Sequence, residues 1–70
     1  MKKLWFAVQA IYTLERKLVG AELGEVRLQI PGTEPPADGE ITKDGVIVVT
    51  KWCATKPEMK RLLKELRAQL

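Results

Sequence analysis

Few residues in this 70-residue chain could support catalysis, because it contains neither serine nor histidine. Ser-His and Cys-His pairs therefore cannot form. Cys53 is the single cysteine, and it stands two residues before a predicted helix cap, where a helix N-terminus could favour the thiolate. A small, half-buried residue at the end of a strand explains the same position, since cysteines are commonly buried. We therefore predict a protein that is not an enzyme.

Three acidic residues, Asp38, Glu40 and Asp44, lie close together in the sequence. Carboxylates bind hard cations, but this spacing matches no calcium loop, and Lys43 stands among the acids. The segment PGTEPPADG, residues 31–39, also lacks the spacing of a phosphate-binding glycine loop and a helix after it. We interpret the acids as solvating loop residues, and we predict no metal and no cofactor.

Basic side chains near the C-terminus form the main candidate for a binding site. Residues 55–70 read TKPEMKRLLKELRAQL. At ~100° per residue, four basic positions fall within ~80° of one another, while Glu58 and Glu65 fall almost opposite. This basic stripe consists of Lys56, Lys60, Lys64 and Arg67. Lys51, which precedes the helix, could extend it. Such a stripe predicts contacts to the phosphates of a nucleic acid.

The same pattern is also typical of a solvated helix face, on which long side chains extend over the edge of the core. Two further observations would strengthen the nucleic-acid interpretation. One is an exposed tryptophan beside Lys51, because bases stack on accessible aromatic rings. The other is a position beside the stripe for the basic residues of the N-terminal third, which are Lys2, Lys3, Arg16 and Lys17.

The charge distribution supports an alternative function, a protein-interaction module. The net charge of +3 combines basic ends with residues 22–44, where six side chains are acidic and two are basic. An acidic middle could meet the basic ends of another copy or of another protein. The segment EVRLQI, residues 25–30, could be an edge strand open to strand addition. A core at this length rarely supplies more than ~3–5 kcal/mol, so we also expect a homo-oligomer.

The C-terminal helix that carries the basic stripe is predicted from its cap and its apolar face. Thr55 and Glu58 form a T-x-x-E capping box, with Pro57 in the first turn. Five apolar residues fall within roughly 100° of arc and predict the face that packs on the core. They are Met59, Leu62, Leu63, Leu66 and Leu70.

Segments before this helix predict antiparallel strands. GEITK and VIVVTKW flank Asp44-Gly45, which is a type I′ hairpin signal and places Ile41 near Val48. The apolar run of residues 46–49 predicts a central strand covered on both faces. Apolar and polar residues alternate in EVRLQI, which predicts a half-buried strand with one wet face. Residues 31–39 then form a loop.

The N-terminal third supports two interpretations. Aromatic and β-branched residues favour a strand over residues 3–12, followed by a helix from about residue 14 to 23 with Thr13 as its cap, giving β-α-β-β-β-α. A 3-4 spacing of apolar residues instead fits one helix over residues 4–19 capped by Gly20, giving α-β-β-β-α. Either order predicts an α+β fold, in which a small antiparallel sheet of three to four strands packs against the C-terminal helix in a single domain over residues 1–70.

Two resemblances to known families follow from the predicted elements. With Lys56, Lys60 and Lys64 at the start of the last helix, the α-β-β-β-α order resembles that of double-stranded RNA-binding domains. This resemblance implies phosphate contacts from the start of that helix. A strand-strand-helix unit with the T-K-P-E cap is also similar to the small DNA-binding arms of phage-type integrases.

Composition also predicts a cellular setting. A lone cysteine without a partner is typical of a reducing compartment, so we expect a cytoplasmic protein. The absence of asparagine and the 30% of charged residues are typical of thermophile proteins. The apolar run of residues 4–14 is too short to span a bilayer, so we predict no membrane association.

Overall fold

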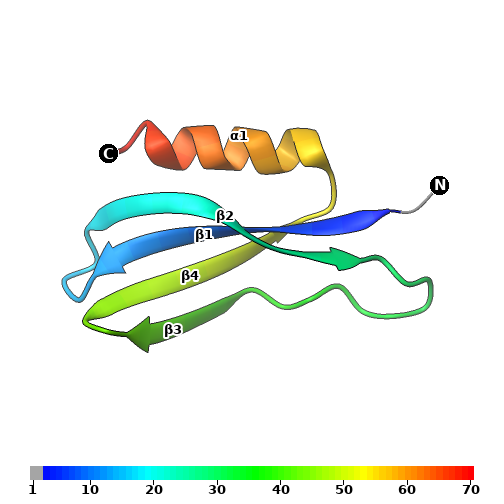
Figure 1. Ribbon diagram of the computed structural model, residues 1–70, viewed down its shortest axis with the longest axis horizontal. Coiled ribbons are helices and arrows are strands. Elements are labelled where there is room, and N and C mark those ends of the chain that lie inside the picture. Colours follow the sequence, from blue (N-terminus) through cyan, green and yellow to red (C-terminus); the bar gives the residue numbers. More distant parts are fainter. Residues whose placement is uncertain (1–2) are drawn as a thin grey trace.

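Four strands and one helix make up the computed structural model, which describes residues 3–70. The elements are β1 (Leu4–Thr13), β2 (Leu18–Leu28), β3 (Gly39–Lys43), β4 (Val46–Cys53) and α1 (Lys56–Arg67). The strands pair antiparallel in the order β2-β1-β4-β3. Helix α1 lies across one face of this sheet (Figure 1). The predicted α+β fold, with a small antiparallel sheet packed against a C-terminal helix, is confirmed.

The segment after β1 is a turn and a second strand, so the predicted helix over residues 14–23 is wrong. Thr13 closes a hairpin instead of capping a helix: its backbone N–H donates to the carbonyl of Lys17 at 2.8 Å, and its hydroxyl accepts from the N–H of Lys17 at 3.1 Å. Arg16 adopts the left-handed conformation that the turn requires, with φ of 66°. The element order is therefore β-β-β-β-α.

Pairing with β1 explains why residues 18–28 form a strand despite a helix-like apolar spacing. Leu18 and Ala21 reach the core from β2. Gly20 lies inside β2 and does not cap a helix, so the alternative helix over residues 4–19 is also wrong. Gly20 and Gly24 are poor helix formers, and sheet pairing then decides the conformation.

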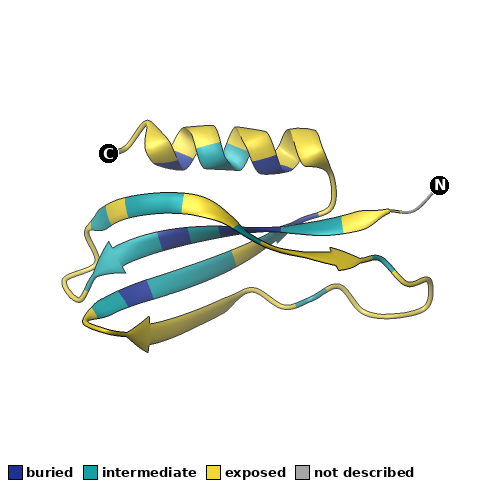
Figure 2. Cartoon of the chain, viewed as in Figure 1, coloured by how far each residue is buried: buried dark blue, intermediate teal, exposed yellow. Residues whose placement is uncertain are grey.

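The strands present two different faces. On the face that α1 covers, the buried core consists of Val8, Ala10, Cys53, Met59 and Leu66 (Figure 2). The opposite face, which we call the open face, carries alternate residues, including the pairs Ala7–Trp52 and Ile11–Val48. In the part of the chain that the structure describes, no helix covers the open face. Strand β4 is central, as predicted, but a helix covers only one of its faces, and Val46 and Val48 are half-buried.

Strands β3 and β4 form the predicted hairpin. Asp44 and Gly45 both have positive φ, 52° and 79°, as a type I′ turn requires. Ile41 pairs with Val48, as predicted. The connection from β2 to β3 contains no helix or strand, and its Asp38 carboxylate accepts a hydrogen bond from the backbone N–H of Trp52 at 2.9 Å. This bond holds the end of the loop against β4.

Strand β2 forms one edge of the sheet, and its apolar residues are more exposed than predicted. EVRLQI is indeed extended, but the strand ends at Leu28. Val26 and Leu28 are 53% and 50% exposed, so the prediction of a half-buried strand is wrong. Their exposure follows from position, because the end of β2 crosses β1 and turns away from α1 (Figure 1).

A bulge interrupts the pairing of β1 with β2. Phe6 pairs with Val26 and Val8 pairs with Leu23, so two residues of β2 stand opposite Ala7 alone. One of them is Gly24, where an added Cβ would lie 3.2 Å from the Cβ of Ala7. A side chain at this position would therefore press against Ala7. The bulge also places Leu23 and Val26 on the same face of the sheet, although they are three residues apart.

Helix α1 begins with the predicted cap. The hydroxyl of Thr55 accepts from the N–H of Glu58 at 3.3 Å, and the Glu58 carboxylate accepts from the N–H of Ala54 at 3.3 Å. The predicted apolar face packs on the sheet except at its end, because the helix stops at Arg67 and Leu70 is 61% exposed. Within residues 3–70, this helix is too short and too polar to cross a membrane.

Candidate nucleic-acid interface

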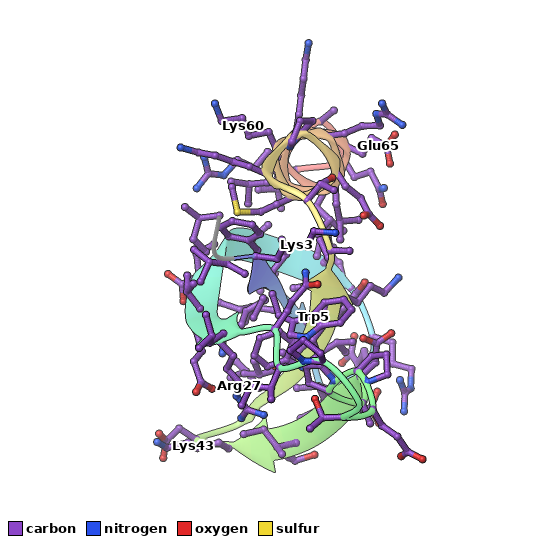
Figure 3. The ribbon with its side chains drawn as sticks, turned by 90° about the vertical axis from the view of Figure 1, so that its right-hand side faces the viewer. Lys3, Trp5, Arg27, Lys43, Lys60 and Glu65 are labelled. Atoms are coloured by element: carbon purple, nitrogen blue, oxygen red, sulfur yellow. The ribbon has the colours of Figure 1, made fainter. Side chains whose placement is uncertain are left out.

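The position of α1 decides which strand the basic stripe lies beside. Arg67 donates from Nε to the backbone carbonyl of Ala21 in β2 at 3.2 Å. The stripe therefore faces the β2 side of the molecule. Figure 3 looks along α1 and shows Lys60 and Glu65 projecting to opposite sides of the helix, as their predicted angular separation requires.

All four side chains of the basic stripe are exposed. Among residues 3–70, ion pairs join Arg16 to Glu40 and Arg27 to Glu25, each at 3.0 Å, and none involves the stripe. The positive charge of the stripe is thus not compensated by a carboxylate within hydrogen-bonding range in the described part of the chain. A surface of this kind attracts anions over roughly a Debye length, ~8 Å at physiological ionic strength.

Lys51 is exposed but lies apart from the basic stripe. It pairs with Val8 in the alignment of β4 with β1, so its side chain belongs to the face that α1 covers. Strand β1 separates β4 from β2, and the stripe faces β2. Lys51 consequently stands on the other side of α1 from Arg67, toward the side on which Glu65 projects.

One N-terminal basic residue lies near the start of the stripe. Lys3 and Lys56 line the same open hollow, of about 390 Å³, at the start of α1. Arg16 instead pairs with Glu40 of β3, and Lys2 lies outside the described residues. Sequence reasoning grouped Lys3 with the N-terminal charges but could not locate it, because its proximity to Lys56 depends on the pairing of β1 with β4.

The aromatic residues do not extend the stripe. Trp52 alternates with Lys51 and therefore lies on the open face, opposite α1. The guanidinium of Arg27 covers its ring at 4.8 Å from the centroid, which is a cation–π contact. The carboxylate of Glu25 holds Arg27 there through two hydrogen bonds, at 3.0 and 3.1 Å, and these bonds lower the pKa of Glu25.

Two exposed aliphatic side chains that the sequence analysis missed lie on the β2 side of the molecule, the side that the basic stripe faces. Leu23 and Val26 are 54% and 53% exposed on the α1 side of β2. Leu23 fell inside the wrongly predicted helix, and Val26 was expected to be half-buried. The only trace in the sequence is Gly24, because a glycine inside a strand can mark a bulge, and the bulge shifts the alternation of β2 by one residue.

The remaining candidates for chemistry are dispersed or buried. Cys53 is 2% exposed, and burial is the main reason why the pKa of its thiol is raised, with Glu58 and Asp38 adding to the effect. Among the described residues, no three His, Cys, Asp or Glu side chains gather as a metal site would require. A thiol in this setting is protonated and inaccessible.

No protein-family model, curated protein or solved structure matches the chain. The β-β-β-β-α order also departs from the α-β-β-β-α order on which the resemblance to double-stranded RNA-binding domains depends.

Proposed function

We propose that this protein is a small non-enzymatic module that binds nucleic acid through phosphate contacts from the basic stripe. The observation that carries the proposal is the exposure of four cations on one side of α1, none of them in an ion pair among residues 3–70. Lysine and arginine in such a row neutralise phosphates and release condensed counterions, which drives sequence-independent binding.

Each residue of the stripe has a role under this proposal. Lys56, Lys60 and Lys64 supply point charges to successive phosphates, and Lys3 extends the row at the start of α1. Arg67 uses its Nε–H in the hydrogen bond to the carbonyl of Ala21, and its other guanidinium N–H groups can still contact phosphate. Lys51 stands on the far side of α1, so we expect it to contribute less than the helical residues.

A binding titration with matched variants tests the proposal. We expect labelled mixed-sequence DNA and RNA to bind the wild-type protein at low salt, as measured by fluorescence anisotropy. The double variant K60Q/K64Q should weaken binding more than K43Q/K51Q, although the two variants lose the same charge. Equal losses would indicate attraction to net charge alone, and no binding at low salt would exclude the proposal.

Strand β2 supports a second candidate function, a protein-interaction module. Its edge is free in the described part of the chain, and Leu23 and Val26 are exposed on the side of the molecule that the stripe faces. An acidic polypeptide with apolar side chains would suit this surface. This candidate would be favoured if a glutamate-rich peptide with apolar side chains bound more tightly than nucleic acid in the same titration.

A further inference from the structure

Strand β2 is the longest strand of the sheet, and one of its sides has no partner among residues 3–70. It spans 11 residues, whereas β3 at the other edge spans five. Long edge strands with exposed apolar side chains tend to pair with another chain unless charges, prolines, bulges or a covering segment protect the edge. Two hydrogen bonds show which backbone groups of β2 face this free side.

The first bond orients the end of β2. The N–H of Gln29 donates to the carbonyl of Lys3 at 2.9 Å, so Gln29 bonds toward β1. Alternate residues of a strand bond to the same side. Arg27 therefore also bonds toward β1, and the N–H and carbonyl groups of Val26 and Leu28 face the free edge.

The second bond orients the start of β2, before the bulge. The carbonyl of Ala21 accepts from Arg67, which approaches from α1, so Ala21 exposes its backbone groups at the free edge. Leu23, two residues later, shares this orientation. The outward-facing residues are thus Ala21, Leu23, Val26 and Leu28.

Because of the bulge, residues 22–27 of β2 are complementary to the same segment of a second copy that runs in the opposite direction. Leu23 and Val26 pair with Val8 and Phe6 and lie on the α1 side. Glu22 and Arg27 pair with Gln9 and Trp5 and lie on the open side. A two-fold axis between Gly24 and Glu25 would place Leu23 of one copy opposite Val26 of the other. These two residues lie on the same face of the sheet, and the backbone groups of both face outward.

We propose that β2 pairs antiparallel with β2 of a second copy about this two-fold axis. Leu23 then stands opposite Val26 of the second copy, and Glu22 stands opposite Arg27. The symmetry repeats each contact, which makes the interface isologous. The two sheets become one continuous sheet of eight strands, with both helices on the same face.

Three kinds of contact stabilise this pairing. The outward backbone groups of Leu23 and Val26 exchange about four hydrogen bonds across the seam. Their side chains form apolar cross-strand pairs, and Glu22 forms opposite-charge pairs with Arg27, which also bonds to Glu25 of its own copy. The seam is narrow, so we expect a weak dimer, with Kd on the order of 100 µM.

Light scattering or sedimentation across a concentration series tests the dimer. We expect a mass that rises from monomer to dimer in the wild-type protein. Leu23→Lys should hold the protein in the monomeric form, because two lysines then enter the seam. Ile41→Lys is the matched control at the β3 edge, since Ile41 is 60% exposed and Leu23 is 54% exposed, and it should leave the dimer unchanged.

A charge reversal tests the register itself. Glu22→Arg places like charges opposite Arg27 and should raise Kd roughly tenfold. Adding Arg27→Glu restores opposite charges and should recover most of the affinity. Circular dichroism checks that each variant is folded. Failure of the double variant to recover any affinity would contradict the register.

Amide exchange supplies a readout that does not depend on variants. The backbone amides of Leu23, Val26 and Leu28 should gain protection as protein concentration rises, while the inward amide of Arg27 is protected throughout. A monomeric mass up to millimolar concentration, or unprotected outward amides in a dimer, would overturn the proposal. Protection only in the presence of another protein would assign the edge to a different partner.

Discussion

Cys53 has the features of a core residue and lacks those of a nucleophile. It is 2% exposed, contacts the cluster that joins the sheet to α1, and has a thiol pKa raised mainly by burial. A raised pKa favours the neutral thiol, whereas thiol reagents attack the thiolate. The sequence allowed either an activated or a buried cysteine at this position, and in the structure Cys53 is buried.

Alkylation of Cys53 should be slow in the native protein. We expect iodoacetamide to label the folded chain many-fold more slowly than the chain in denaturant at the same pH, as followed by mass spectrometry. Because the folded-state pKa of the thiol lies above its unfolded value, stability from this group is present below the unfolded pKa and is lost as pH rises through the folded pKa. Equal labelling rates in the two states would contradict the burial.

Strand β2 should tolerate side chains unequally at its two glycines, because Gly24 lies in the bulge and Gly20 does not. A Cβ at Gly24 would lie 3.2 Å from both Ala7 and Gln9, whereas a Cβ at Gly20 would meet Ile11 at an ordinary 3.6 Å. We expect Gly24→Ala to lower the free energy of unfolding by about 1–3 kcal/mol. Gly20→Ala should be neutral or slightly stabilising. Urea denaturation of both variants measures this difference, and equal effects would refute the close approach at the bulge.

The elements that sequence patterns predicted well are those whose signals are local. Thr55 and Glu58 cap α1, and Asp44-Gly45 turns the β3–β4 hairpin, through contacts within a few residues. The second strand could not be predicted in this way. Leu18 and Ala21 have the spacing of a helix face, and the bulge puts Leu23 and Val26 on one face at a spacing of three. Only pairing with β1 turns that pattern into a strand.

The same distinction applies to the candidate site. The angular grouping of the basic stripe depends on α1 alone, and it was predictable from periodicity. The separation of Lys51 from the stripe depends on the order of the strands, and the approach of Lys3 to Lys56 depends on the start of β1. Neither relation leaves a signal in the local sequence.

Dimerisation through β2 and phosphate binding by the basic stripe together predict a common binding groove. Pairing of β2 with a second copy places both basic stripes on the same face, on either side of the seam. Because α1 lies over β1 and β2, the helix axes would stand ~14 Å apart, from about three strand spacings of ~4.8 Å. Because both stripes face the seam, their cations lie closer together than the helix axes, and their mutual repulsion opposes the dimer most strongly at low salt. Leu23 and Val26 would form part of the floor between them.

Nucleic-acid binding and dimerisation should therefore be coupled. If one nucleic acid contacts both stripes, it stabilises the dimer, and reciprocity requires the dimer to bind it more tightly. We expect the dimer Kd to fall when a duplex is added, as measured by sedimentation with labelled protein. Leu23→Lys should bind the duplex more weakly than Ile41→Lys does. An unchanged dimer Kd would show that the two properties are independent.

The salt dependence of binding tests the basic stripe most directly. For duplex DNA, each phosphate contact contributes about 0.9 to the slope of log K against log salt concentration, so four contacts predict a slope of about −3 to −4 for the wild-type protein. The variant K60Q/K64Q should reduce the magnitude of this slope by about 2, and K43Q/K51Q should change it by less than half as much. The same reduction in both variants, or a wild-type slope near zero, would contradict the assignment of phosphate contacts to the stripe.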